Sequence, residues 1–129
     1  MIHPESHVSN LILSQRLKEL GVKQESLFWY VNLGKDEWHR RWEGEVFGLP
    51  GIEGLERVSA FFASELGEMM DAHSGKTNLL TRASLKGKWY CEISPSYIEQ
   101  KTHCEYADTE ADARAKMLIY LLENGLIKN

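Results

Sequence analysis

The C-terminal segment, residues 107–129, constrains the fold more than any other part of the chain, because it carries every signal of a complete helix. Thr109 is a favourable N-cap residue, and the acidic residues at 110 and 112 lie where the helix dipole stabilises negative charge. An apolar stripe follows, and Gly125 with Leu126 matches a Schellman-type helix end. We therefore predict a helix over residues 110–124 that packs on a sheet. The residues expected to pack there are Ala111, Ala115, Leu118, Ile119 and Leu122.

Two ion pairs are expected along this helix, both at i,i+4 spacing and in the favoured order. They are Glu110 with Arg114 and Asp112 with Lys116. Each pair would stabilise the helix by about 0.2–0.5 kcal/mol.

Two further helices are predicted nearer the N-terminus. The first covers residues 11–20, starts at Ser9 or Asn10, and ends at a glycine in the same way as the C-terminal helix. The second covers residues 57–70, with Ser59 or Ser64 as its N-cap. Gly67 interrupts this helix and weakens it by about 1 kcal/mol relative to alanine.

Five segments are short, apolar or alternating, and rich in aromatic and β-branched residues, which is typical of strands. They are residues 27–33, 38–46, 79–85, 88–94 and 100–106. A turn at residues 34–36 makes the first two a hairpin, and residues 48–54 form a glycine-rich loop. The pattern predicts an α+β fold, with a mainly antiparallel sheet of about five strands and two or three packed helices. We expect a single domain, residues 1–129, with a flexible N-terminal arm over about residues 1–9.

Composition and charge exclude several classes of protein. Hydrophobic residues make up 43% and charged residues 26% of the 129 positions, which is ordinary for a globular domain. The net charge of −4 disfavours binding to duplex nucleic acid. No apolar run is long enough to span a bilayer, and the first ten residues do not resemble a signal peptide. Two cysteines are too few for a disulfide scaffold, so free thiols and a reducing cytoplasm are expected.

Three stretches of the chain resemble segments of a known group of proteins. They are RLKELGVKQES at 16–26, ELGEM at 65–69, and DTEADARAKML at 108–118 continuing to Gly125 and Leu126. On these residues, over roughly half of its length, the chain resembles a loose group of small uncharacterised proteins encoded in phage and prophage genomes. The resemblance implies a phage origin and a bacterial cytoplasm, and it implies no catalytic or binding residues.

The segment 38–42, with the sequence WHRRW, has the most suggestive side chains. Aromatic faces stack on nucleobases, and arginine makes forked contacts with phosphates. An alternating strand places Trp38, Arg40 and Trp42 side by side on one face. These three residues and Arg41 are the candidate ligand-binding residues. The alternative is a sheet face whose tryptophans pack under a helix while the arginines extend to solvent.

Cys91, His103 and Cys104 lack the closely spaced ligand pairs of zinc sites. A symmetric hairpin centred on residues 97–98 would place the two thiols opposite each other on its inner side, with His103 pointing the other way. Two small buried cysteines are then expected.

No catalytic or cofactor motif is complete in the sequence. Residues 75–77 match the end of a phosphate-binding loop, but Met70 stands where that motif requires its first glycine. The sequence therefore predicts no catalytic residue, no metal site and no cofactor.

Three functions are compatible with these patterns. The favoured one is a small, non-enzymatic phage-type protein that binds a host component, either sequestering a nucleotide signal or antagonising a host defence protein. The second is a small enzyme whose acid/base site is assembled from His39, His103 or the Glu65–Glu68 pair. The third is a structural or interaction module that acts as a homo-oligomer. The expected partners are thus a host protein or a small nucleotide, without duplex nucleic acid or membrane.

Overall fold

The computed structural model describes residues 7–42, 55–73, 77–83, 87–95 and 103–127. Most of the predicted N-terminal arm, the end of the second predicted strand and the whole predicted loop at 48–54 lie outside these ranges. Within them, the elements in chain order are α1 (Leu11–Glu19), β1 (Phe28–Asn32), β2 (Trp38–Trp42), β3 (Arg57–Ala60), α3 (Ala63–His73), β4 (Thr77–Ala83), β5 (Trp89–Pro95), β6 (His103–Ala107) and α4 (Glu110–Glu123).

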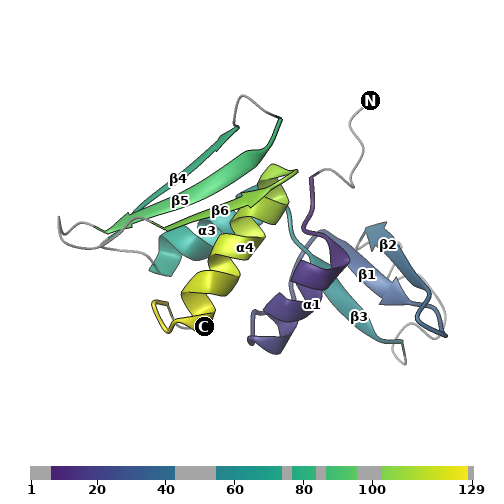
Figure 1. Ribbon diagram of the computed structural model, residues 1–129. Helices are drawn as coiled ribbons and strands as arrows, with labels where there is room; N and C mark the ends of the chain where they lie inside the picture. The colour runs from purple at the N-terminus through teal and green to yellow at the C-terminus, as the bar shows by residue number, and fades with distance from the viewer. Residues whose placement is uncertain (1–6, 43–54, 74–76, 84–86, 96–102, 128–129) are drawn as a thin grey trace.

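The fold is α+β, as the sequence predicts, with helices packed on antiparallel sheets. The described strands divide into two three-stranded sheets, ordered β2-β1-β3 and β4-β5-β6, where a single sheet of about five strands was expected. Helices α3 and α4 cover one face of the β4-β5-β6 sheet, and α1 lies between α4 and the other sheet (Figure 1). Helix α1 therefore joins the two halves of the molecule.

The predicted helix over residues 57–70 is wrong in its first part. Residues 57–60 form strand β3, which pairs with β1, and Val58 is buried in that pairing. Helix α3 then begins at Ala63, where the Phe62 N–H donates to Glu65 Oε1 at 2.9 Å. A glutamate at the third helical position commonly caps the helix start in this way. Neither Ser59 nor Ser64 is the cap, because Ser59 lies in strand β3 and Ser64 lies inside α3. The Glu65 side chain caps the start of the helix instead.

The predicted starts and ends of α1 and α4 are confirmed. Asn10 caps α1 by accepting from the Leu13 N–H at 2.9 Å, and Thr109 caps α4 through the Asp112 N–H at 3.2 Å. At the end of α4, Gly125 has a φ of 65°, which a residue with a Cβ seldom adopts. The Leu126 N–H donates to Leu121 O at 2.9 Å, the bond expected of a Schellman end.

Helix α4 is the centre of the core, because it contacts both other described helices and all three strands of one sheet. Its buried residues are Ala111, Ala113, Ala115, Met117, Leu118 and Leu121. The predicted packing residues Ile119 and Leu122 are half-buried against the same core. A helix buried on several sides needs small residues where its neighbours approach, and the three alanines supply them.

One of the two ion pairs predicted on α4 is confirmed. Arg114 Nη2 lies 3.1 Å from Glu110 Oε1. The other prediction is wrong, because both partners bond elsewhere. The Asp112 carboxylate accepts from the Asn10 N–H at 2.7 Å, and Lys116 Nζ donates to Tyr106 O at 2.7 Å.

Gly67 allows α3 and α4 to approach closely. A Cβ at this position would collide with the Arg114 guanidinium, whose Cζ would lie 3.4 Å away. Arg114 Nη1 reaches past the glycine to donate to Ala63 O at 2.7 Å. The residue that weakens the helix on propensity grounds thus leaves room for a side chain of the neighbouring helix.

The N-terminal segment is fixed from Val8 onward, which shortens the predicted flexible arm. Val8 is 1% exposed and forms a β-bridge with Phe62. The Ser9 N–H donates to Phe61 O at 2.8 Å, and the Tyr30 hydroxyl donates to Ser9 O at 2.8 Å. Residues 8 and 9 are therefore part of the core structure.

None of the helices in the part of the chain that the structure describes has the length and apolar composition needed to cross a bilayer.

Candidate functional site

The candidate residues Trp38, Arg40 and Trp42 share one face of strand β2, at the edge of the β2-β1-β3 sheet. We call these three residues the β2 surface. Trp42 is 52% exposed, while Trp38 and Arg40 are half-buried. An exposed edge-strand tryptophan does not fit the alternative in which both tryptophans pack under a helix.

The β2 surface lies on the same side of the sheet as helix α1. Arg40 is paired with Tyr30 and Tyr30 with Val58, so these three residues form one row across that side. Val58 lines a hollow of about 470 Å³ together with Lys18 of α1. This row of three residues therefore runs across the sheet from Val58, near α1, to Arg40 of the β2 surface on the edge strand.

Arg41 does not belong to the β2 surface. It pairs with Trp29 on the opposite face of the sheet, and its Nη1 donates to Arg40 O at 3.1 Å. The structure thus divides the four predicted site residues into a set of three and a single arginine behind them. The alternation of side chains along a strand had indicated this separation.

The register between β5 and β6 differs by one residue from the predicted hairpin. Cys91 pairs with Glu105, and Glu92 pairs with Cys104, so the two cysteines lie on opposite faces. His103 pairs with Ile93 and lies on the inner face with Cys91, contrary to prediction. A shift of one residue moves every side chain of a strand to the other face.

Neither cysteine has the surroundings of a reactive thiol. Cys91 is fully buried. Burial raises the pKa of the Cys104 thiol, and the carboxylate of Glu92, its partner across the strands, raises that pKa further. A nucleophilic cysteine requires a lowered pKa. Among the described residues, no three His, Cys, Asp or Glu side chains are placed to hold a metal ion.

The shifted register gives His103 two close partners. Its Nε2 lies 2.9 Å from Glu105 Oε1. Its ring stacks on the ring of Tyr120 from α4, with centroids 3.5 Å apart and planes at 7°. Both side chains of the His103–Glu105 pair are about one-third exposed, at 33% and 29%. The histidine and glutamate are therefore held in fixed orientations at the edge of the sheet.

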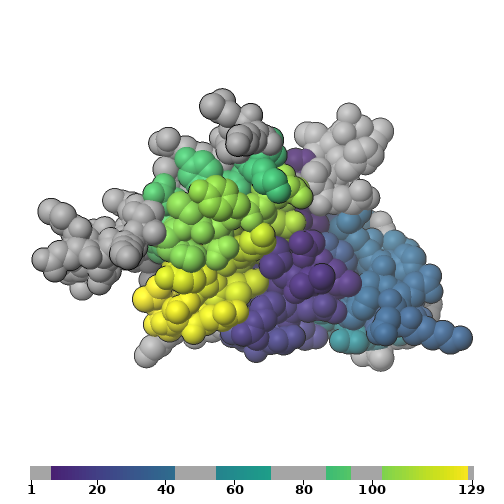
Figure 2. Space-filling view, in the orientation of Figure 1, coloured from purple at the N-terminus to yellow at the C-terminus, as the bar shows by residue number. Residues whose placement is uncertain are grey.

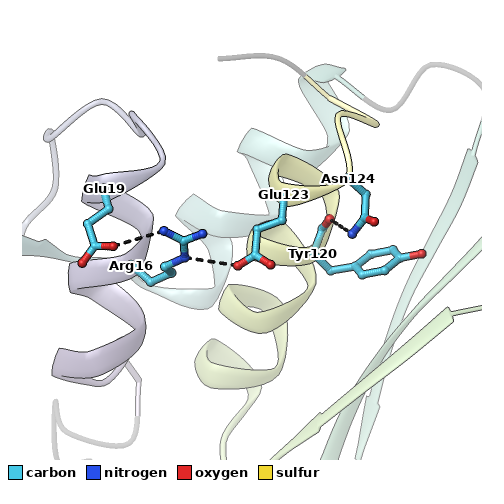
Figure 3. Close-up of polar contacts among 5 residues, drawn as sticks. All are labelled: Arg16, Glu19, Tyr120, Glu123 and Asn124. Carbon is cyan, nitrogen blue, oxygen red and sulfur yellow. Dashed lines mark hydrogen bonds and ion pairs between the residues drawn. The ribbon is translucent and has the colours of Figure 1, made fainter.

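Beside this pair, a hollow of about 180 Å³ lies over the outer side of α4, between α1 and β6. It is lined by Leu13, Glu105, Lys116, Ile119, Tyr120 and Glu123. We call it the α4 trough. In Figure 3, Glu123 points toward α1, where Arg16 Nε donates to its Oε1 at 3.1 Å, while the Tyr120 ring points toward the strands. The sequence patterns did not indicate this site, although residues 116, 119, 120 and 123 have the spacing of one helix face.

The other acid/base candidates have structural roles or simple surface contacts. Glu65 caps α3, and its burial raises the pKa of its carboxyl group. His39 Nε2 lies 3.2 Å from Glu37 Oε1 at the exposed end of the β1–β2 hairpin. Neither residue lines the α4 trough.

Comparisons of the chain with protein-family models, with curated proteins and with solved structures find no match. The class of protein that the structure shows is therefore given by its α+β fold alone.

Proposed function

We propose that this chain is a non-enzymatic binding protein, and that its β2 surface binds a small nucleotide. The observation that carries the proposal is the placement of Trp38, Arg40 and Trp42 on one face of an edge strand, with Trp42 about half exposed. Tryptophan stacks on any base, and an arginine between two such platforms can contact phosphate.

The spacing of the β2 surface suits a ligand with two bases or with one base and an extended phosphate chain. Successive residues on one face of a strand are about 7 Å apart, so the two tryptophans are separated by about 13 Å with the arginine between them. A dinucleotide could stack one base on each ring and place its phosphates at Arg40. A mononucleotide would engage one ring only.

The biological role that we propose is sequestration of a host nucleotide signal by a phage-encoded protein. The resemblance of the helical segments to phage proteins supports this setting, and the raised pKa of the Cys104 thiol is unfavourable for a nucleophile. A host protein that inserts an acidic, aromatic segment onto the same surface is the alternative partner.

Binding to nucleotides is tested by calorimetry with mononucleotides, cyclic mononucleotides and dinucleotides. Stacking on an aromatic side chain contributes about 1–3 kcal/mol per base, so Trp42→Ala should raise Kd by about 5- to 150-fold. Arg40→Ala should raise it by at least about tenfold.

The matched control is Arg41→Ala, which removes the same charge from the same strand but from the opposite face. It should leave Kd within about twofold of the wild type, apart from a small long-range charge effect. Equal losses in the two arginine variants would show that only net charge matters. Binding that survives both Trp42→Ala and Arg40→Ala would contradict the proposed surface.

A further inference from the structure

The α4 trough and the β2 surface are separate features of the molecule. Figure 2 shows α4 on one side of α1 and the β1–β2 hairpin on the other. The trough has its own lining from α1, β6 and α4. None of the residues that line the trough belongs to the β2 surface.

One end of the trough carries a positive and a negative group together. Lys116 Nζ donates to Tyr106 O at 2.7 Å, which places the ammonium group beside the strand residue next to Glu105. Glu105 Oε1 is held by His103, and its Oε2 makes no hydrogen bond within the described chain. This end thus offers cationic donors and a carboxylate acceptor, as an α-carboxylate and an α-ammonium group require.

The other end of the trough is acidic. Glu123 Oε1 accepts from Arg16, and the same guanidinium contacts Glu19 at 3.1 Å (Figure 3). Two carboxylates around one guanidinium leave a net negative charge. Glu123 Oε2 has no hydrogen bond among the described residues and can accept from a ligand.

The middle of the trough is apolar. Ile119 and Leu13 line it from α4 and α1, and both are only partly buried. The two charged ends, at Lys116 and Glu123, are seven residues apart on one helix, or about 10 Å along its axis. A volume of about 180 Å³ holds roughly six waters and suits a small metabolite.

We propose that the α4 trough binds a free basic amino acid of the lysine or arginine type. The α-carboxylate contacts Lys116, and the α-ammonium group contacts Glu105. The aliphatic part of the side chain lies over Ile119 and Leu13, and the terminal cation contacts Glu123. His103 is a positioning residue, because its Nε2 holds the Glu105 carboxylate. The His103 ring is itself fixed by stacking on the Tyr120 ring.

Binding is measured by calorimetry and by NMR shift titration with L-lysine and L-arginine. Three analogues each remove one contact: norleucine lacks the side-chain cation, cadaverine lacks the carboxylate, and 6-aminohexanoate lacks the α-ammonium group. Each analogue should bind at least about tenfold more weakly than lysine, as expected for the loss of one charged hydrogen bond.

Glu123→Gln should raise the Kd for lysine by at least about tenfold and leave the Kd for norleucine unchanged. Lys116→Met should weaken the binding of lysine and leave the binding of cadaverine unaffected. Glu25→Gln, an acid-to-amide change at an exposed site outside the trough, is the matched control and should bind as the wild type does.

Trp42→Ala should also bind lysine normally, which separates this proposal from nucleotide binding at the β2 surface. The proposal is overturned if neither lysine nor arginine binds at millimolar concentration. It is equally overturned if lysine and norleucine bind with the same Kd, or if Glu123→Gln binds lysine as the wild type does.

Discussion

Replacing Gly67 by alanine should destabilise the protein, although the same change in an ordinary helix interior is stabilising. The helix would gain about 1 kcal/mol from the better propensity of alanine. The new methyl group, however, would occupy the space of the Arg114 guanidinium, which must then release Ala63 O. A hydrogen bond from a charged donor contributes about 1.5–3 kcal/mol. Since the Arg114 side chain is 23% exposed, we take the lower part of that range, about 1.5–2 kcal/mol.

The net expectation for Gly67→Ala is a loss of about 0.5–1 kcal/mol in the free energy of unfolding. The assay is urea denaturation of a double-mutant cycle with Arg114→Ala. In the Arg114→Ala background the clash is absent, so Gly67→Ala should instead add about 1 kcal/mol. The coupling energy between the two sites is then about 1.5–2 kcal/mol.

The matched control is Ser64→Ala, an exposed position on the same helix. Its effect should be additive with Arg114→Ala to within about 0.5 kcal/mol. If Gly67→Ala stabilises the wild-type protein as much as it stabilises the Arg114→Ala variant, the close approach of the two helices at Gly67 has no energetic consequence.

Three further stability predictions follow from single side chains. Ser59→Ala should add about 1 kcal/mol to the unfolding free energy in urea, because the Ser59 hydroxyl is 0% exposed and has no hydrogen-bond partner among the residues that the structure describes; a loss of stability would contradict this. Asp112→Ala should cost about 1–2 kcal/mol, since its carboxylate joins the Asn10 backbone and side chain to the first turn of α4; an unchanged chemical-denaturation midpoint would count against that link. Burial raises the folded-state pKa of Glu65 above its unfolded value, so folding favours the protonated carboxyl group. The stability gained in this way is present at low pH and is lost as the pH rises through the folded pKa. Glu65→Gln should therefore gain stability relative to the wild type as the pH is raised from acid to neutral in parallel melts, and a constant difference would exclude the effect.

The helices at the two ends of the chain could be predicted from the sequence because their signals are local. Asn10 and Thr109 cap helices through their own side chains, and Gly125 ends one through its own backbone conformation. The hairpin turn is equally local, and Lys35 and Asp36 both have positive φ there. Such features depend on a few neighbouring residues, so the sequence contains all that determines them.

The misassigned elements depend on distant contacts. The helical spacing of apolar residues at 61–70 predicts a helix that also includes residues 57–60, but pairing with β1 makes those four residues a strand. The β5–β6 register depends on how the inner face packs under α4, where His103 meets Tyr120. No short stretch of sequence records these pairings, which is why the β2 surface could be anticipated and the α4 trough could not.

The position of α4 after all the elements that it packs against also determines when those elements can assemble during synthesis. Its alanines, Met117, Leu118 and Leu121 fill the space that α1, α3 and the β4-β5-β6 sheet share. Until these residues have left the ribosome, the earlier elements have no common core to assemble on. The elements that pack against α4 therefore assemble only after this helix has been synthesised, and loss of even the last two turns of α4 would leave the rest of the molecule without its centre.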